Sequence, residues 1–250
     1  MLRFLDIFLF DNLLIFQKGE LHMEISNESL LISKKHLEYK VEDWKNGKEN
    51  VLLITGLSGG GKSTMAKTFQ DKYNAVNIEL DLFEHNRLLF TLNGHSARPE
   101  KTLRDGDKII RDYFNSTYGG KVNWNDVPDE EFYSEFMKFF KYLLKYANSN
   151  KSKKFVFEGI QIAGIVSANL EGSVLNNLPC IVIGTSVFTS MKRRIKRDKN
   201  SGDSMLEHPF KLLKWYLKRN KNIELFRKSA KNNLKKSTEA FIDFCYTEMD

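Results

Sequence analysis

A glycine-rich turn between two apolar patterns of different period is the feature that most constrains this chain. Residues 51–55 form a short apolar run with β-branched members, which predicts a buried strand. The next six residues, Gly56-Leu-Ser-Gly-Gly-Gly61, cannot continue that strand. From residue 62 to residue 73 the apolar side chains recur at helical spacing, namely Met65, Ala66 and Phe69. The segment therefore predicts a strand, a tight turn and a helix, in that order.

Strand and helix patterns continue to alternate after this segment. Three further apolar runs predict strands at residues 75–80, 155–157 and 180–184. Longer periodic stretches predict helices at residues 131–146, 189–199 and 210–234. Residues 240–245 fit either a fifth strand or a last helical turn. Strands that alternate with helices predict an α/β fold, in which a parallel sheet is covered by helices on both faces.

The length of 250 residues suits one large domain or one domain with an inserted lobe. We expect residues 51–250 to form this domain. Residues 82–150 separate the second and third predicted strands by far more than a usual α/β connection, and their pattern is that of a helical insertion. Residues 23–50 are expected to form short helical or irregular pieces before the domain.

The first residues carry a separate prediction. Residues 4–16 are apolar but are interrupted by two aspartates, and the stretch is too short to span a bilayer. No small-residue cleavage site follows, so a signal peptide is not indicated. Lys18-Gly19-Glu20 can be encoded by a sequence that contains a bacterial ribosome-binding site, and Met23 follows at a plausible spacing. We therefore predict that translation starts at Met23 and that residues 1–22 are a translated leader.

The composition is that of an ordinary globular protein, with 41% hydrophobic and 28% charged residues. The two cysteines, Cys180 and Cys245, do not form a metal-type pair. A disulfide framework is therefore not expected, and a reducing cytoplasm is the predicted compartment. The histidines His85, His95 and His208 show no spacing typical of metal ligands.

The net charge of +7 is concentrated towards the end of the chain. Residues 191–236 hold 16 lysines and arginines against 4 acidic residues, so the remainder of the chain is net negative. Such a segment indicates a surface that meets phosphate, either on a nucleotide or on a nucleic acid backbone. A solvated helical face is the alternative for its scattered lysines, whereas its arginines cluster at Arg193, Arg194 and Arg197.

Residues 56–63 satisfy the pattern G-x-x-x-x-G-K-[S/T] in full. Glycines let backbone N–H groups point around phosphate oxygens, and the following helix presents its positive N-terminus to the same anion. Lys62 is expected to reach the β- and γ-phosphates, and Ser63 is expected to give an oxygen to Mg²⁺. The sequence thus predicts a site for ATP and Mg²⁺. Its expected residues are Gly56, Ser58, Gly59, Gly60, Gly61, Lys62, Ser63 and Thr64.

Other sequence features distinguish among the proteins that carry this pattern. A GTPase also needs D-x-x-G, which is absent, and N-K-x-D, whose aspartate is missing from Asn220-Lys-Asn-Ile223. Helicase-like ATPases carry a strand that ends in Asp-Glu, whereas the third predicted strand ends in Glu158 and Gly159. The remaining features resemble the small P-loop kinases, which include nucleoside and nucleotide kinases, polynucleotide kinase and the zeta toxins.

This resemblance rests on four segments between residues 51 and 203. The first is the glycine-rich motif. The second is Asp81 at the end of the second strand, which in this group commonly takes the proton of the acceptor hydroxyl. The third is Phe157-Glu158-Gly159, which resembles the acidic strand end that holds Mg²⁺-bound water. The fourth is residues 189–203, which resemble the arginine-bearing lid that closes over the triphosphate.

The resemblance implies phosphoryl transfer from ATP to a small-molecule acceptor, a hydroxyl or phosphate compound of nucleoside or nucleotide type. The catalytic residues it implies are Lys62, Asp81, Arg193 and Arg197. Arg194 joins the nucleotide-binding residues, and Ser63 and Glu158 are the expected metal ligands. Arg193 and Arg197, at i and i+4, fall on one helical face. Simpler explanations stay open, because Asp81 can cap a helix and Glu158 can pair with a lysine.

In this group the segment after the second strand builds the acceptor pocket. Residues 82–150 contain Arg87, Arg98, Arg104 and Arg111, which suit a phosphorylated or anionic acceptor. The stretch Asp81-Leu-Phe-Glu-His85 also resembles the D-x-F-R motif of zeta toxins, with Glu84 in place of the arginine. Ile160 likewise replaces the threonine of their E-G-T motif. A UDP-sugar acceptor is therefore an alternative.

Two other function classes remain open. A nucleic-acid-binding ATPase or polynucleotide kinase would use residues 191–236 as a surface that contacts the phosphate backbone. However, the aromatic residues of this segment, Trp215 and Tyr216, fall in an apolar helical pattern and are predicted to be core. The other class is a nucleotide-gated regulatory protein without an acceptor. No membrane partner is expected.

Overall fold

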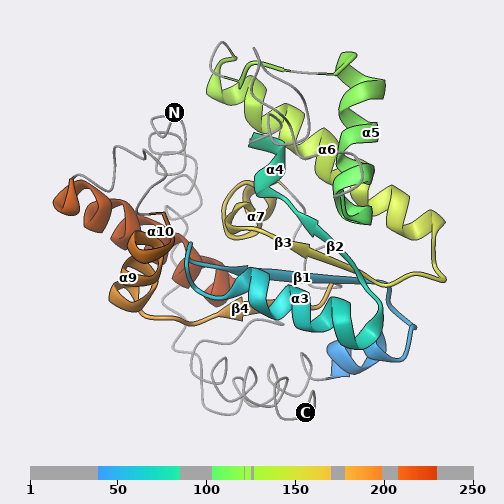
Figure 1. Cartoon of the computed structure of the whole chain (residues 1–250), viewed down its shortest axis with the longest axis horizontal. Helices are drawn as coiled ribbons and strands as arrows, with labels where there is room; N and C mark the ends of the chain where they lie inside the picture. Colours follow the sequence, from blue (N-terminus) through green and yellow to red (C-terminus); the bar gives the residue numbers. More distant parts are fainter. Residues whose placement is uncertain are drawn as a thin grey trace.

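The computed structural model describes residues 39–84, 103–120, 122–124, 127–169, 178–198 and 208–229. Four strands and the helices around them follow one another along the chain (Figure 1). The strands are β1 (Val51–Gly56), β2 (Val76–Glu79), β3 (Phe155–Glu158) and β4 (Cys180–Ile183). The helices are α3 (Lys62–Tyr73), α4 (Asp81–Glu84), α5 (Asp105–Tyr118), α6 (Asp129–Ser149), the 3₁₀ helix η5 (Ile160–Ala163), α7 (Ile165–Asn169), α9 (Val187–Asp198) and α10 (Pro209–Ser229).

The four strands form one parallel sheet in the order β2-β3-β1-β4. In this sheet Ile54 of β1 stands opposite both Glu158 of β3 and Ile181 of β4. The carboxyl end of β1 therefore lies between the carboxyl ends of β3 and β4. The segments that follow these three strands therefore lie together at this edge of the sheet.

Side chains of the strands alternate between two hydrophobic clusters, as the period of a strand requires. Val51, Leu53, Phe155 and Phe157 belong to one cluster, whereas Leu52, Ile54 and Val156 belong to the other. All of these side chains are buried. A sheet that is buried on both faces explains why the strands are continuous apolar runs rather than alternating ones.

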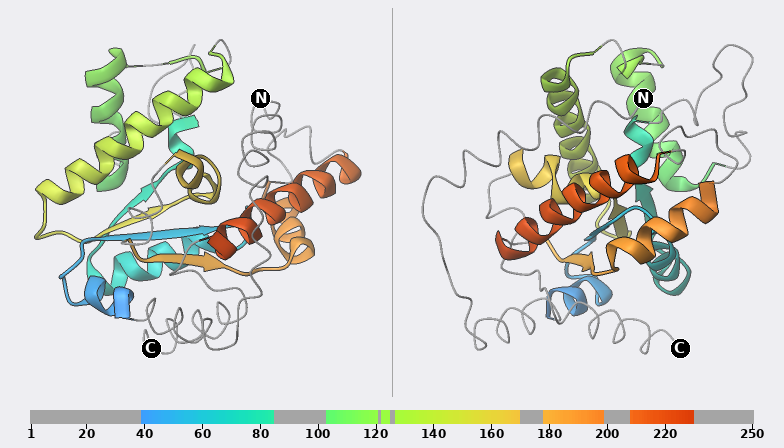
Figure 2. Two further views of the ribbon diagram at one scale, coloured as in Figure 1. Left: turned by 180° about the vertical axis from the view of Figure 1, so that it is seen from behind. Right: turned by 90° about the vertical axis from the view of Figure 1, so that its left-hand side faces the viewer.

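Helices cover both faces of the sheet (Figures 1 and 2). One face packs against α3 and a short helical segment at residues 39–45, through Trp44, Met65 and Phe69. The other face packs against the helices α5, α6, α7 and α10. The chain leaves β1 through α3 on the first face and leaves β3 through η5 and α7 on the second. The carboxyl ends of β1 and β3 thus form a topological switch point, where open α/β sheets commonly bind ligands.

The structure confirms the predicted α/β class and parallel sheet. All four predicted strands and the predicted helices at residues 62–73, 131–146, 189–199 and 210–234 are present, with boundaries that differ by a few residues. Within residues 82–150 the described segments are mostly helical, as expected. Residues 1–22 and 240–245 lie outside the described residues.

Trp215 and Tyr216 are buried, which confirms their prediction as core residues. No helix in the described ranges combines the length and the apolar composition that crossing a membrane requires.

Candidate functional site

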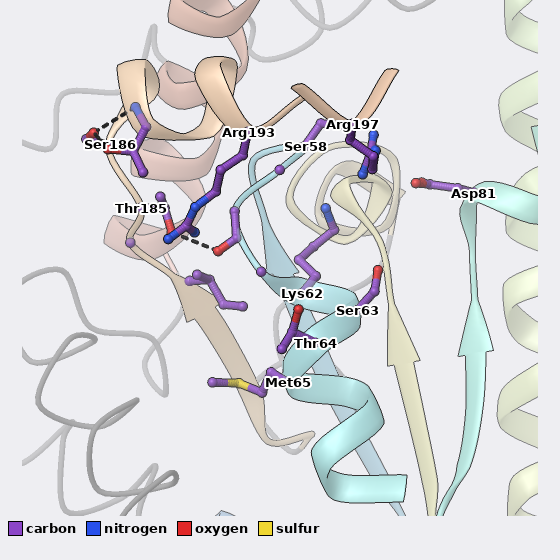
Figure 3. Close-up of a pocket in the computed structure, with 16 residues that line it drawn as sticks. Ser58, Lys62, Ser63, Thr64, Met65, Asp81, Thr185, Ser186, Arg193 and Arg197 are labelled. Atoms are coloured by element: carbon purple, nitrogen blue, oxygen red, sulfur yellow. Dashed lines mark hydrogen bonds between the residues drawn. The ribbon is translucent and has the colours of Figure 1, made fainter. Parts of the chain in front are cut away.

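A cavity of about 800 Å³ opens at the carboxyl end of β1 and β4 (Figure 3). Residues 58–65 form one wall of it, and residues 183–186 with Thr189 form another. Arg193 and Arg197 of α9 and Asp81 of α4 complete the lining. The cavity therefore collects side chains from four separate elements at the switch point of the sheet.

The turn between β1 and α3, residues 57–61, is here named the glycine loop. Gly59 and Gly61 have φ angles of +76° and +104°, which L residues with side chains rarely adopt. A Cβ atom on Gly59 would also lie 2.4 Å from the carbonyl oxygen of Ser190 in α9. Glycine at position 59 thus serves both the turn and a close backbone contact with α9.

Lys62 is the first residue of α3 and lines the cavity behind the glycine loop. Its side chain is buried, and its Nζ donates a hydrogen bond to the carbonyl oxygen of Leu57 at 3.3 Å. The N-cap residue Gly61 has no side chain to satisfy the first N–H groups of the helix. The positive N-terminus of α3 and the ammonium group of Lys62 therefore face the same cavity, and together they suit a polyanionic ligand.

Ser63 and Glu158 bring two oxygen-bearing side chains together beside Lys62. The Ser63 hydroxyl donates a hydrogen bond to Oε2 of Glu158 at 3.0 Å. Oε1 of Glu158 is buried and has no hydrogen-bond partner in the part of the chain that the structure describes. Burial raises the pKa of Glu158 to about 7, against the opposing effect of the Lys62 charge. An unsatisfied carboxylate oxygen next to a serine hydroxyl suits a small hard cation such as Mg²⁺.

Within the described ranges, no group of three or more His, Cys, Asp or Glu side chains could hold a metal ion. His208, which lies in these ranges, is exposed. Mg²⁺ is usually held by one or two protein ligands together with phosphate oxygens and water. The Ser63 and Glu158 pair therefore fits a metal that arrives with a nucleotide.

Asp81 follows β2, and its carboxylate points into the cavity from the side of that strand (Figure 3). One of its carboxylate oxygens accepts a hydrogen bond from Nε2 of Gln161 at 2.7 Å. The same Nε2 lies 3.5 Å from Oε1 of Glu84. Gln161 is buried, and its amide holds two carboxylates of α4 side by side. Burial and the charge of Asp81 raise the pKa of Glu84 to about 7.

The arginine cluster of α9 divides between two surfaces. Arg193 and Arg197 line the cavity, as expected for residues one helical turn apart (Figure 3). Arg194 is buried, and its guanidinium carbon lies 5.0 Å from the centroid of the Trp215 ring in α10. The structure therefore places Arg194 against α10 and not among the side chains that line the cavity.

The arginines of the acceptor-side insertion have a structural role where the structure describes them. Arg104 forms ion pairs with Glu79 of β2 at 2.7 Å and with Asp107 at 2.9 Å. It also closes a capping box at the start of α5, so it joins this helix to the sheet. Arg111 lies 3.7 Å from Asp112. Arg87 and Arg98 lie outside the described residues.

Sequence reasoning predicted most of the cavity lining but missed Thr185. It also missed Gln161 and Tyr216, which contact residues of the lining from outside the cavity. Gln161 is the polar residue in an otherwise apolar stretch directly after the third strand, and that contrast was a usable signal. Thr185 donates a hydrogen bond to the carbonyl oxygen of Gly60 at 2.8 Å. Tyr216 was predicted as core, and the sequence pattern gave no sign of its contact with the glycine loop.

The comparisons with known proteins add no relative. No protein-family model matches this sequence, and no curated protein is significantly similar to it.

Proposed function

We propose that this protein is a P-loop kinase that transfers the γ-phosphoryl group of ATP to a hydroxyl group of a small acceptor. One observation carries the proposal. A single cavity is lined by a glycine loop with its lysine, by a carboxylate that follows strand β2 and by two arginines of α9. Phosphoryl transfer requires alignment and charge neutralisation, and these residue types supply both.

The glycine loop and Lys62 are suited to hold the β- and γ-phosphates of the nucleotide. Ser63 and Glu158 would hold Mg²⁺ on the same phosphates, and the ion would supply charge neutralisation there. Arg193 and Arg197 approach the cavity from α9, where they can neutralise charge on the group in transfer. These cations stand on one side of the cavity, and Asp81 stands on the other.

Asp81 is the proposed general base. In the reaction, the acceptor oxygen bonds to the γ-phosphorus while the bond from that phosphorus to the β–γ bridging oxygen breaks. The acceptor proton passes to the Asp81 carboxylate, and ADP leaves. Gln161 donates to Oδ1 of Asp81, so Oδ2 is available to accept a proton from the substrate.

The geometry favours an alcohol over a phosphate as the acceptor. An alcohol must lose a proton during transfer and gains from a base, whereas a phosphate acceptor is already ionised at neutral pH. Asp81 also places a carboxylate in the cavity, and its negative charge would repel a phosphorylated compound. Arg104, predicted to attract such an acceptor, is instead engaged by Glu79 and Asp107.

Transfer of label from γ-labelled ATP tests the proposal directly. The panel would contain nucleosides, nucleotides, UDP-sugars, small alcohols and 5′-hydroxyl oligonucleotides, each with the wild-type protein and with the Lys62→Ala variant. We expect a labelled product from an alcohol acceptor that the variant does not form. Release of labelled phosphate alone, equal with every acceptor, would contradict a kinase and favour a regulatory ATPase. Label on nucleotides alone would contradict the preference for an alcohol.

A further inference from the structure

Tyr216 of α10 contacts the glycine loop from outside the motif. Its side chain is fully buried, and its hydroxyl donates a hydrogen bond to the carbonyl oxygen of Ser58 at 2.9 Å. The carbonyl oxygen of Ser190 in α9 lies 3.4 Å from the same hydroxyl. Tyr216 therefore joins three elements, because one phenolic oxygen reaches the loop, α9 and α10.

The hydrogen bond to Ser58 fixes the direction of a backbone N–H group. A trans peptide is planar, so the C=O of Ser58 and the N–H of Gly59 point in opposite directions. Since Tyr216 holds this carbonyl on the outside of the loop, the N–H of Gly59 faces the inside. Thr185, which lines the cavity, donates to the carbonyl oxygen of Gly60 and so fixes the orientation of the peptide bond between Gly60 and Gly61. Two hydroxyl groups from distant elements thus orient two amides of one anion-binding turn.

The same tyrosine connects the loop with the helix that carries the cavity arginines. Its phenolic oxygen accepts a hydrogen bond from Arg194, and burial raises the pKa of the phenol, which keeps the hydroxyl protonated as a donor to Ser58. Arg194 lies between Arg193 and Arg197 in the sequence of α9. The backbone of Gly59 also packs directly against Ser190 of α9. The position of α9 relative to the loop is therefore set in part by Tyr216.

We infer that Tyr216 is a positioning residue for triphosphate binding, which it promotes by holding the glycine loop in its anion-binding form against α9. This inference rests on the proposed function, because it assigns a role within the same nucleotide site. Phenylalanine at position 216 would keep the ring and its packing but would leave the Ser58 carbonyl without its donor. The expected cost is that of one hydrogen bond, which corresponds to about two- to tenfold weaker binding.

The test compares Tyr216→Phe with Tyr113→Phe. Tyr113 is also buried and loses its hydroxyl in the matched variant, but it lies on α5. Calorimetry at a temperature well below unfolding would give Kd for MgATP and for inorganic tripolyphosphate. We expect Kd to rise about two- to tenfold for both ligands in Tyr216→Phe and to stay at the wild-type value in Tyr113→Phe. Thermal unfolding of both variants would show whether a difference in stability accounts for the difference in Kd.

The outcomes separate the two proposals. If the wild-type protein binds neither ligand, the proposed function fails before any variant is measured. If the wild type binds both ligands and Tyr216→Phe binds them equally well, the inference on Tyr216 fails alone. Equal losses of affinity in the two variants would also overturn it, since the effect would then be a general loss of stability. Should Tyr216→Phe not fold, Thr185→Val tests the same orientation of the loop, and wild-type affinity in that variant would contradict it.

Discussion

The two sides of the cavity differ in charge and in how they are built. The phosphate side consists of the glycine loop, Lys62 and the arginines of α9, so the side chains that reach the cavity there are cationic. The acceptor side presents Asp81, which Gln161 connects to Glu84. A triphosphate fits the first side, and a hydroxyl compound that must lose a proton fits the second.

Cationic side chains of this protein differ in whether they face the cavity or form ion pairs that stabilise the fold. Lys62 faces the cavity, whereas Arg104 on the acceptor side is engaged by Glu79 and by Asp107, whose side chain is 1% exposed. An arginine that forms two ion pairs at a helix start contributes to the fold and has little capacity left for a substrate. Arg104 therefore does not offset the negative charge of Asp81 in the cavity.

The largest expected effect is that of removing the central cation on the phosphate side. Lys62→Ala should reduce phosphoryl transfer by more than about a thousandfold, because the β- and γ-phosphate charge loses its main partner. A label-transfer assay measures this loss. Lys67→Ala is the matched control, since Lys67 lies in the same helix, is exposed and pairs with Asp71. Transfer by Lys62→Ala within tenfold of the Lys67→Ala rate would contradict the proposed phosphate side.

Removal of the base on the acceptor side should act on the rate and spare the nucleotide. Asp81→Asn should lower turnover by roughly two to four orders of magnitude, since the acceptor proton loses its destination. The Kd for MgATP should stay within about threefold of the wild-type value, because Asp81 stands opposite the phosphate side. Asp71→Asn, an exposed position on α3, is the control. Normal turnover in Asp81→Asn would remove the base from the mechanism.

The structural role of Arg104 can be tested by measuring the free energy of unfolding of a variant. Arg104→Met should lower the free energy of unfolding by about 1–2 kcal/mol, because the nearly buried Asp107 carboxylate loses its partner. The pKa of Arg104 is raised by Asp107 and Glu79, in agreement with a stabilising interaction of its charged form. Lys108→Met, in the same helix turn, removes an exposed pair and should cost less than about 0.5 kcal/mol. Urea unfolding measures both values, and equal costs would contradict this role.

The phosphate side could be predicted from the sequence because its parts are local. The glycine loop and the start of α3 form one unbroken stretch, and the helix spans residues 62–73 as its apolar period predicted. The same period explains Arg193 and Arg197, which lie on one face of α9. Arg194 is one position further round the helix, so it faces α10 and not the cavity. Its predicted nucleotide contact did not take account of the helix that covers this face.

The acceptor side could not be predicted in the same way because its contacts are distant in the sequence. Gln161 and Asp81 are 80 residues apart. The contact of Tyr216 with Ser58 on the phosphate side spans 158 residues and was missed for the same reason. Local periodicity carries no information on such pairs, because they form only when the sheet brings its strand ends together. Arg104, predicted to suit an anionic acceptor, shows the reverse error. Arg104 has the charge for an anionic acceptor, but the capping of α5 uses that charge.

The smallest expected effect concerns the pH dependence of stability at Glu84. The pKa of this carboxyl is raised to about 7 from a model-compound value of 4.5, so the folded protein holds the proton more tightly than the unfolded chain. The contribution of Glu84 to the free energy of unfolding should therefore be complete below pH 4.5. It should be lost as the pH rises through 7, because the folded protein must then hold a second negative charge beside Asp81.

Glu84→Gln removes this titration and keeps a side chain of similar shape. Relative to the wild type, its melting temperature should be unchanged at pH 5 and higher by about 2–4 °C at pH 8. Glu131→Gln, at an exposed position of α6, shows the effect of removing one surface charge. A difference between Glu84→Gln and wild type that does not grow with pH would mean that burial and the charge of Asp81 do not raise the pKa of Glu84 in the folded protein.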